Sequence, residues 1–214
     1  MRRDERDRGE TRAGGERSSV GAALLGMLSK CMSVPKPTLA RVVAIALEED
    51  VGRGDVTTEA CVDAALTSSA RVAARERLVF CGGEVAAEVF AQLDVRVRVE
   101  PHVVDGAWLE RGAAALTLHG PARSLLQGER VLLNFAQRLS GIATLTRSFV
   151  DALPSGTRTR ITDTRKTTPG LRALERYAVR CGGGHNHRED LAAAVLIKDN
   201  HVAASGGVTP AIER

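Results

Sequence analysis

Polar and charged side chains crowd into three short segments near the C-terminal end of this 214-residue chain. The segments are 163–170 (DTRKTTPG), 182–188 (GGGHNHR) and 198–201 (KDNH). The first and third each follow an apolar stretch that predicts a β-strand, at about 159–163 and 194–198. Because loops at the carboxyl ends of parallel strands converge on one crevice, we expect the three segments to share a common space.

The side chains expected in that space are mainly cationic. Few acids accompany them, and a desolvated cluster of like charges is costly unless an anion occupies it. An Arg guanidinium can grip a carboxylate or phosphate with two hydrogen bonds, whereas Lys offers a point charge. The pattern therefore predicts a small ligand that carries several carboxylates or phosphates. The candidate contacts are Arg165, Lys166, His187, Arg188, Lys198 and, beside them, His201.

Each element also fits a structural role. A pair such as Arg165-Lys166 is usually solvated, and the glycine run 182–184 is typical of a helix stop. His185 and His187 lie two residues apart and share a strand face, but no third ligand follows at a sensible spacing, so a metal site is disfavoured. The carboxylates that follow the predicted strands are more typical of loop caps than of catalysts: Asp163 and Asp199.

The first half of the chain must supply a different scaffold. Apolar residues recur at helical spacing over 39–47, and a short helix is expected at 84–93. Residues 70–81, 94–100 and 113–118 predict strands, the second of them alternating between Val and charged residues. Such alternation indicates a sheet with one wet face, so we expect an α+β unit with a largely antiparallel sheet.

The second half changes pattern. Residues 122–152 predict a long helix interrupted near Ser140-Gly141, and 171–180 predict a helix between two strands. Strand–loop–helix alternation is typical of a parallel α/β barrel or an open α/β sheet. Only two or three such units precede Arg214, too few to close a barrel of about eight units. Either partners complete the sheet or a C-terminal part is absent from this sequence, and we favour absence.

Composition narrows the class of protein. An apolar share of 43% and a charged share of 26% are typical of a globular chain. No apolar run approaches the roughly 20 residues of a membrane helix, and a net charge of +4 with 3% aromatic residues disfavours nucleic acid. The four cysteines form no CxxC pair, which indicates a reducing, cytoplasmic compartment.

Taken in order, five motifs resemble those of the quinolinate phosphoribosyltransferases. The resemblance spans about residues 36–214. The motifs are 49–58 (EDVGRGDVTT), Glu129-Arg130 with 134–144, 163–170, 182–188 and 197–201 (IKDNH).

The resemblance implies an activity and a fold. Members of the family join quinolinate to 5-phosphoribosyl 1-pyrophosphate with Mg²⁺, release CO₂ and pyrophosphate, and yield nicotinate mononucleotide for NAD biosynthesis. The implied fold is α/β, with an N-terminal α/β sandwich domain (34–121) followed by a partial parallel α/β barrel (122–214). Residues 1–33 mix Arg with acids and are expected to form a disordered extension.

The resemblance also implies roles for single residues. Arg165, Lys166, His187, Arg188 and Lys198 would line the quinolinate and phosphoribosyl site, with Lys166 and Lys198 as the catalytic residues. The assembly implied is a homodimer or higher oligomer with shared sites, in which Arg130 reaches the site of the neighbouring subunit.

Two departures and two alternatives accompany this interpretation. Glu189 and Ala193 differ from the usual family residues, and the later barrel strands, which meet the ribose and its phosphate, have no counterpart before Arg214. One alternative is therefore a truncated, inactive homologue, less stable than a completed chain. The other is the related pyridine phosphoribosyltransferase of molybdenum transport operons, although two arginines with Lys198 favour a dicarboxylate.

Overall fold

A three-stranded antiparallel sheet organises the first half of the chain in the computed structural model, which describes residues 33–214. Its strand order is β1 (Thr67–Ala73), β5 (Ala114–Pro121), β3 (Arg98–Pro101), with both outer strands antiparallel to β5. A separate two-stranded ribbon pairs β2 (Leu78–Val79) with β4 (Trp108–Leu109). The expected antiparallel sheet is confirmed, whereas the predicted extension 1–33 lies outside the described residues except for Ser33.

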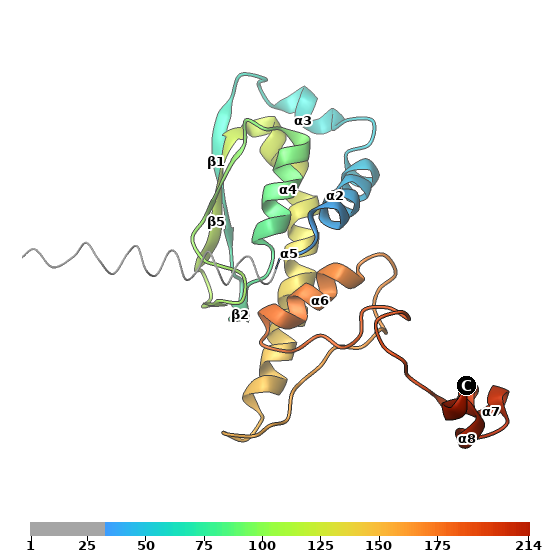
Figure 1. The fold of residues 1–214 in the computed structure, drawn as a ribbon. Coiled ribbons are helices and arrows are strands. Elements are labelled where there is room, and N and C mark those ends of the chain that lie inside the picture. The colour runs from blue at the N-terminus through green and yellow to red at the C-terminus, as the bar shows by residue number, and fades with distance from the viewer. Residues whose placement is uncertain (1–32) are drawn as a thin grey trace, which may run out of the picture. The chain divides into compact units, whose positions relative to one another are not determined.

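Helices cover one face of this sheet (Figure 1). They are α4 (Gly83–Leu93) and the 30-residue α5 (Ala122–Asp151), and α2 (Lys36–Asp50) packs on both of them; a short helix, α3 (Val56–Cys61), follows α2. Each fully buried Leu, Val or Phe side chain contributes about 1.5–3 kcal/mol of transfer free energy to this core. The largest fully buried Leu, Val and Phe side chains of the sheets and these helices are Phe90, Leu116, Leu132, Leu139, Val43, Val79 and Val89.

Helix α5 runs without a break, so the interruption expected near Ser140-Gly141 is wrong. The Ser140 hydroxyl accepts a hydrogen bond from the Cys81 N–H (3.0 Å) and donates to the Cys81 carbonyl (3.3 Å). The serine is therefore satisfied by a neighbouring segment and does not compete for the helix backbone.

Two expected strands are shorter than predicted. Residues 70–81 divide into β1 and β2, because the exposed charged residues 75–77 form a turn between them. Strand β3 begins only at Arg98, since the Asp94 carboxylate accepts the Arg96 N–H (3.0 Å) and folds the preceding residues into a turn. Val95, predicted to alternate with charged residues, is consequently 85% exposed.

The second half contains α6 (Arg172–Cys181), α7 (Asp199–Ser205) and α8 (Val208–Glu213). The strand expected at 159–163 is reduced to one parallel bridge, Thr162 with His185, and the described residues form no strand at 194–198. A parallel strand depends on neighbouring strands for its hydrogen bonds, and the described part of the chain supplies only this one pairing. No helix of the described residues has the length and apolarity needed to cross a membrane.

Candidate functional site

The carboxylate of Asp163 connects the first two of the predicted polar segments. Its Oδ1 accepts the His187 N–H (2.7 Å), and its Oδ2 accepts the side-chain amide of Asn186 (2.6 Å). The Thr162–His185 bridge lies beside it, with the Asp163 N–H donating to the His185 carbonyl (3.0 Å). The structure thus confirms that these two segments share a space, and that Asp163 serves as a loop cap.

Arg176 of α6 completes this connection. Its Nη1 lies 3.3 Å from Asp163 Oδ2 and also donates to the carbonyl oxygens of His187 (3.0 Å) and Arg188 (3.3 Å). The side chains of Asp163 and Arg176 are 5% and 11% exposed, so the pair is desolvated. Sequence reasoning missed Arg176, although its contacts fix the main chain of two predicted ligand residues.

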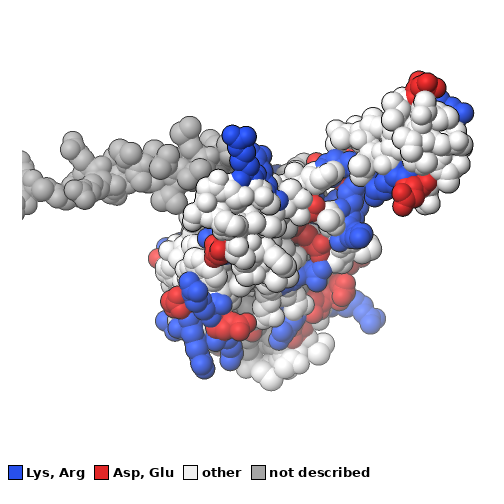
Figure 2. All heavy atoms as spheres, turned by 90° about the horizontal axis from the view of Figure 1, so that it is seen from below, with Lys and Arg blue, Asp and Glu red and all other residues white. Residues whose placement is uncertain are grey.

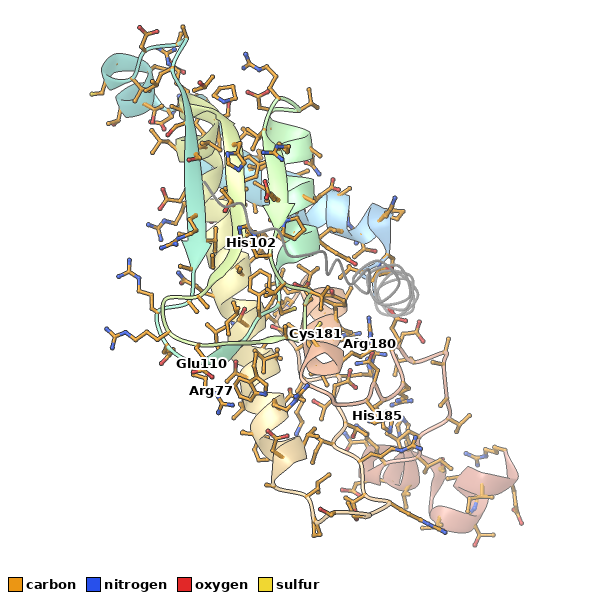
Figure 3. All side chains as sticks on the ribbon, turned by 90° about the vertical axis from the view of Figure 1, so that its left-hand side faces the viewer. Arg77, His102, Glu110, Arg180, Cys181 and His185 are labelled. Atoms are coloured by element: carbon orange, nitrogen blue, oxygen red, sulfur yellow. The ribbon has the colours of Figure 1, made fainter. Side chains whose placement is uncertain are left out.

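Arg176 belongs to a row of three arginines on α6. Arg172 donates from Nε to Thr167 Oγ1 (3.1 Å) and from Nη1 to the Glu189 carbonyl (3.3 Å). Arg180 donates from Nη1 to Asn186 Oδ1; Figure 3 labels Arg180 on α6 and His185 in the loop that follows. Their spacing of four residues places them on one helix face, which is the sequence signal that could have identified them: Arg172, Arg176 and Arg180.

A second carboxylate ties segment 163–170 to helix α5. Glu175 Oε1 accepts a hydrogen bond from Arg138 Nε (3.1 Å), and its Oε2 accepts the Thr168 N–H (3.2 Å). Burial raises the pKa of Glu175, but the hydrogen bonds from Arg138 and Thr168 outweigh it, so the pKa is lowered below its ordinary value of 4.5. The loop is therefore held by an ionised glutamate.

The glycine run ends α6 at Cys181, as the helix-stop interpretation predicts. A Cβ at Gly182 would overlap the Ala143 carbonyl oxygen of α5, so the two segments approach as closely as only glycine allows. Gly183 adopts φ = +88°, a left-handed conformation that favours glycine. The run therefore serves to place the following His185–Arg188 loop against α5.

The predicted ligand residues occupy unlike environments. Arg165 is half-buried, and within residues 33–214 its Nε is buried with no hydrogen-bond partner. Arg188 is half-buried and donates from Nη1 to the Ala194 carbonyl (2.7 Å). Lys166 and His187 have exposed side chains. An unpartnered buried guanidinium N–H is costly, so Arg165 is the strongest indication of a missing acceptor.

The third predicted segment begins helix α7. The Lys198 N–H donates to His201 Nδ1 (2.9 Å), which caps the helix, and the Lys198 side chain is exposed. Convergence of this segment with the other two stays a prediction.

Arg130 lies exposed in the first half of α5. Arg138, eight residues later, contacts the site through Glu175, so the Arg130 Cα lies about 12 Å further along the helix axis. The Arg130 side chain therefore faces solvent, and within residues 33–214 it contacts none of the site residues described above.

The first family motif, 49–58, shapes the turn between α2 and α3. Gly54 adopts φ = +118°, and the Asp55 carboxylate accepts the Thr58 N–H (2.9 Å) as the cap of α3. Hydrogen bonds from Thr58 lower the pKa of Asp55 below its ordinary value. The motif's glycine and aspartate are therefore explained by local structure.

Charges of both signs are interspersed on the face of the molecule shown in Figure 2. Lys and Arg side chains alternate there with Asp and Glu, and no broad surface of one sign extends across that face. This distribution suits a localised anion site better than a long polyanion.

Two sequence-family models match the chain. The quinolinate phosphoribosyl transferase N-terminal domain matches residues 55–140, and the C-terminal domain of the same family matches residues 142–214. The two matches meet inside α5, whereas the sequence pattern placed the boundary at 121, where β5 ends.

Curated relatives cover most of this chain. It is 47% identical over 166 residues to the probable nicotinate-nucleotide pyrophosphorylase [carboxylating] of Bacillus subtilis, covering 78% of this chain and 57% of the relative. The corresponding protein of Mycobacterium leprae is 47% identical over 194 residues, covering 87% and 65%. The quinolinate phosphoribosyltransferase [decarboxylating] 1 of Nicotiana glauca is 41% identical, covering 89% and 54%. The chain thus spans between about half and two thirds of these relatives.

Solved structures give the same match. The nicotinate-nucleotide pyrophosphorylase of Francisella tularensis superposes with a TM-score of 0.80 at 40% identity, covering 85% of this chain and 64% of that one. NadC of Streptococcus pyogenes superposes with a TM-score of 0.80 at 42% identity and the same coverage. The α/β fold class is thereby confirmed.

Proposed function

Because this chain belongs to the quinolinate phosphoribosyl transferase family, we propose that its site binds quinolinate for decarboxylating transfer of a phosphoribosyl group, yielding nicotinate mononucleotide. The named relatives support this activity, a pentosyl transfer that leads to NAD. The observation that supports the choice of substrate is the buried Nε of Arg165, which has no hydrogen-bond partner among residues 33–214 and lies beside a loop fixed by Asp163.

Quinolinate carries two adjacent carboxylates, which suit two guanidinium groups. Arg165 and Arg188 are the half-buried cations of the two joined segments, and each offers a planar fork to a carboxylate. The exposed Lys166 and His187 lie on the same segments and would orient the second substrate. In this proposal Lys166 and Lys198 are the catalytic residues, and their ammonium groups hold anionic oxygens in reacting geometry.

The reaction requires positioning more than a covalent nucleophile. As pyrophosphate leaves, positive charge develops at ribose C1 and the pyridine nitrogen attacks that carbon. The resulting pyridinium stabilises the electron pair left at C2 when the adjacent carboxylate departs as CO₂, and C2 then takes up a proton from solvent. The contribution of the arginines is to align the two anions and exclude water.

Mg²⁺ does not fit the described protein donors of this site. The carboxylates of Asp163 and Glu175 are each ion-paired with an arginine, Arg176 and Arg138 respectively, so their negative charge is already compensated. Mg²⁺ prefers carboxylate oxygens and substrate phosphates in octahedral geometry. We therefore propose that any Mg²⁺ enters as a partner of the pyrophosphate of the second substrate.

We further propose a cytoplasmic homodimer with shared sites. The exposed position of Arg130, about 12 Å along α5 from Arg138, supports a contact with the partner subunit. In a twofold dimer the same residue serves both sites reciprocally.

The experiment is a comparison of quinolinate and nicotinate binding to the purified chain by calorimetry. Nicotinate lacks one carboxylate and leaves a cation unpaired; a charged hydrogen bond is worth about 1.5–3 kcal/mol, so nicotinate should bind roughly 10-fold to more than 100-fold more weakly. Arg165→Ala should abolish the preference, and Arg111→Ala, which removes an exposed arginine, should preserve it. Equal affinities for the two acids would contradict the proposal.

Transfer is tested with carboxyl-labelled quinolinate. Release of labelled CO₂ that requires both 5-phosphoribosyl 1-pyrophosphate and Mg²⁺, with an equal amount of nicotinate mononucleotide, supports the reaction. Binding of quinolinate without this release would restrict the proposal to recognition of the dicarboxylate.

A further inference from the structure

Two cysteines and one aspartate from distant parts of the chain meet in the interior. Cys81 follows β2, Asp105 lies between β3 and β4, and Cys181 ends α6. The two thiol sulfurs and a carboxylate oxygen all lie within 4.8 Å of one another. Cys81 and Cys181 are 0% and 2% exposed, respectively. The cluster contains none of the residues assigned to the proposed reaction.

The carboxylate of Asp105 is held rigidly. Its Oδ1 accepts the N–H groups of Gly82 (3.0 Å) and Gly83 (2.9 Å), and its Oδ2 accepts the Tyr177 hydroxyl (2.8 Å). Metal-binding carboxylates are oriented by such outer hydrogen bonds. Asp105 is therefore a preorganised oxygen donor beside two sulfur donors.

The main chain around the two thiols is equally constrained. The Cys81 N–H is bound by Ser140, and the Gly106 N–H donates to the Phe80 carbonyl (2.7 Å). Gly106 adopts φ = +92° and packs so closely that an added Cβ would lie 3.0 Å from the Cys181 carbonyl oxygen. The three donors are thus presented by fixed segments, as a closed structural metal site requires.

The surroundings of the cluster disfavour the negatively charged forms of Cys81, Asp105 and the neighbouring Tyr177. The hydrogen bond with the Cys181 thiol, burial and the Asp105 charge all raise the pKa of the Cys81 thiol. Burial raises the pKa of Asp105 despite its three donors, and burial with the Asp105 charge raises the pKa of Tyr177. A divalent cation would offset this repulsion, because it binds thiolate and carboxylate donors directly.

We propose that Cys81, Cys181 and Asp105 form a binding site for a thiophilic divalent cation such as Zn²⁺. On binding, each thiol gives up one proton to solvent, and the two thiolates and the carboxylate coordinate the cation. Ligands of one tetrahedral Zn²⁺ lie up to about 3.8 Å apart, so the observed separations require shifts of about 1 Å at most. A solvent molecule would supply the fourth donor. Thiolate donors select Zn²⁺ or Cd²⁺ over Mg²⁺.

The site would join the two halves of the fold. Cys81 and Asp105 belong to the sheet half, whereas Cys181 ends the helix that carries the loop-binding arginines. A cation there binds only the folded chain, and so it stabilises that state.

The test uses the full chain with Cys31→Ser and Cys61→Ser, in which only the two buried cysteines remain. Cys31 lies outside the described residues, and Cys61 is exposed. Cd²⁺ added to the reduced protein should bind once per chain, produce an ultraviolet thiolate-to-metal charge-transfer band and raise the Tm. Cys81→Ala or Cys181→Ala should abolish the band, and Asp105→Asn should weaken Cd²⁺ binding at least tenfold. Asp151→Asn, an exposed aspartate on α5, is the matched control and should leave binding unchanged.

A folded chain without a charge-transfer band would overturn the proposal, as would a band that survives Cys81→Ala. A Cys81–Cys181 disulfide in place of metal binding, detected as a mass loss of two hydrogen atoms, would also overturn it. Because an alanine variant could fail to fold, a second measurement uses the parent chain with all four cysteines. Cd²⁺ should slow the alkylation of two of its thiols relative to the metal-free chain, and equal rates with and without Cd²⁺ would count against the site.

Discussion

Asp163 and Arg176 form a desolvated ion pair of 3.3 Å that holds the loop after α6 from two sides. Asp163 accepts the N–H of His187, and Arg176 donates to the carbonyl of the same residue. A peptide segment whose donor and acceptor are both bound has little freedom to shift. The pair therefore determines where the side chains of His187 and Arg188 begin.

Asp163→Asn should destabilise the chain strongly. The substitution leaves the Arg176 charge buried without its partner, and breaking a buried pair costs about 3–5 kcal/mol. Denaturant unfolding measures the loss. Asp151→Asn removes an exposed carboxylate from α5 and should change the unfolding free energy by less than about 0.5 kcal/mol. Equal stability of the two variants would show that the pair contributes nothing.

Glu175→Gln should reveal a pH-dependent contribution to stability. The folded-state pKa of Glu175 is lowered from 4.5, so ionised Glu175 stabilises the chain above that pH, and the contribution is lost as pH falls through the folded value. The difference in unfolding free energy between parent and variant should therefore be largest near neutrality and narrow below pH 4.5. Glu129→Gln, an exposed glutamate of α5, is the control. A difference that stays constant across the acid range would refute this assignment.

Two glycines of α5 should respond oppositely to alanine. A Cβ at Gly128 would lie 2.6 Å from Phe90 Cε1, whereas a Cβ at Gly141 meets no atom of the described chain within 4 Å. Overpacking costs about 1–3 kcal/mol, whereas the higher helix propensity of Ala over Gly stabilises the helix by about 1 kcal/mol. Gly128→Ala should therefore lower the free energy of unfolding. Gly141→Ala should gain about 1 kcal/mol. The Tm of each variant, measured by thermal unfolding, tests these two predictions. A Gly128→Ala variant with a raised Tm would disprove the predicted clash.

Arg130→Ala should affect binding and spare stability, in contrast to Arg123→Ala. Arg130 is exposed, so Arg130→Ala should change the free energy of unfolding by less than about 0.5 kcal/mol. Its affinity for quinolinate should fall about tenfold or more. Arg123 donates from Nε (2.9 Å) and Nη2 (2.8 Å) to the Val62 carbonyl, so its loss should cost about 1–3 kcal/mol of stability. Unfolding curves and calorimetry separate the two effects.

The shared-site proposal adds a complementation experiment. Arg130→Ala and Lys198→Ala chains, mixed one to one in an active preparation, would form hybrid dimers in which one of two sites has neither lesion. Free exchange then predicts roughly a quarter of parental turnover from a twofold dimer. No recovery in verified mixed dimers would remove Arg130 from the partner's site.

Periodicity predicted the elements that bury one regular face. Strand β5 and helices α4 and α6 lie within a few residues of the expected ranges, because their apolar spacing matches the strand or helix period. The continuity of α5 was missed, since Ser140 is satisfied by Cys81, a partner far away in sequence. Two of the three motif segments, 163–170 and 182–188, were correctly predicted to meet, but the arginines that join them were not.

Those joining residues act through tertiary contacts that spacing does not encode. Arg172, Arg176 and Arg180 are typical of a solvated helix face until the following loop is placed against them. The cluster of Cys81, Asp105 and Cys181 has no local motif, because its members come from three separate elements. Composition indicated an excess of positively charged side chains, but it could not distinguish arginines that hold the loop from arginines that face a ligand.

The arginines of α6 grip the loop largely by its peptide carbonyls, which every amino acid possesses. Arg172 binds the carbonyl of Glu189, and Arg176 binds those of His187 and Arg188. At residues 187–189 the anchoring of the loop therefore does not depend on side-chain identity, in contrast to Asn186, whose side chain is itself bound. Glu189, for which a different family residue was expected, can thus vary while its carbonyl stays anchored. Residues 187–189 can therefore be substituted one at a time without loss of these hydrogen bonds, because α6 binds their carbonyl oxygens and a substitution leaves the carbonyl in place.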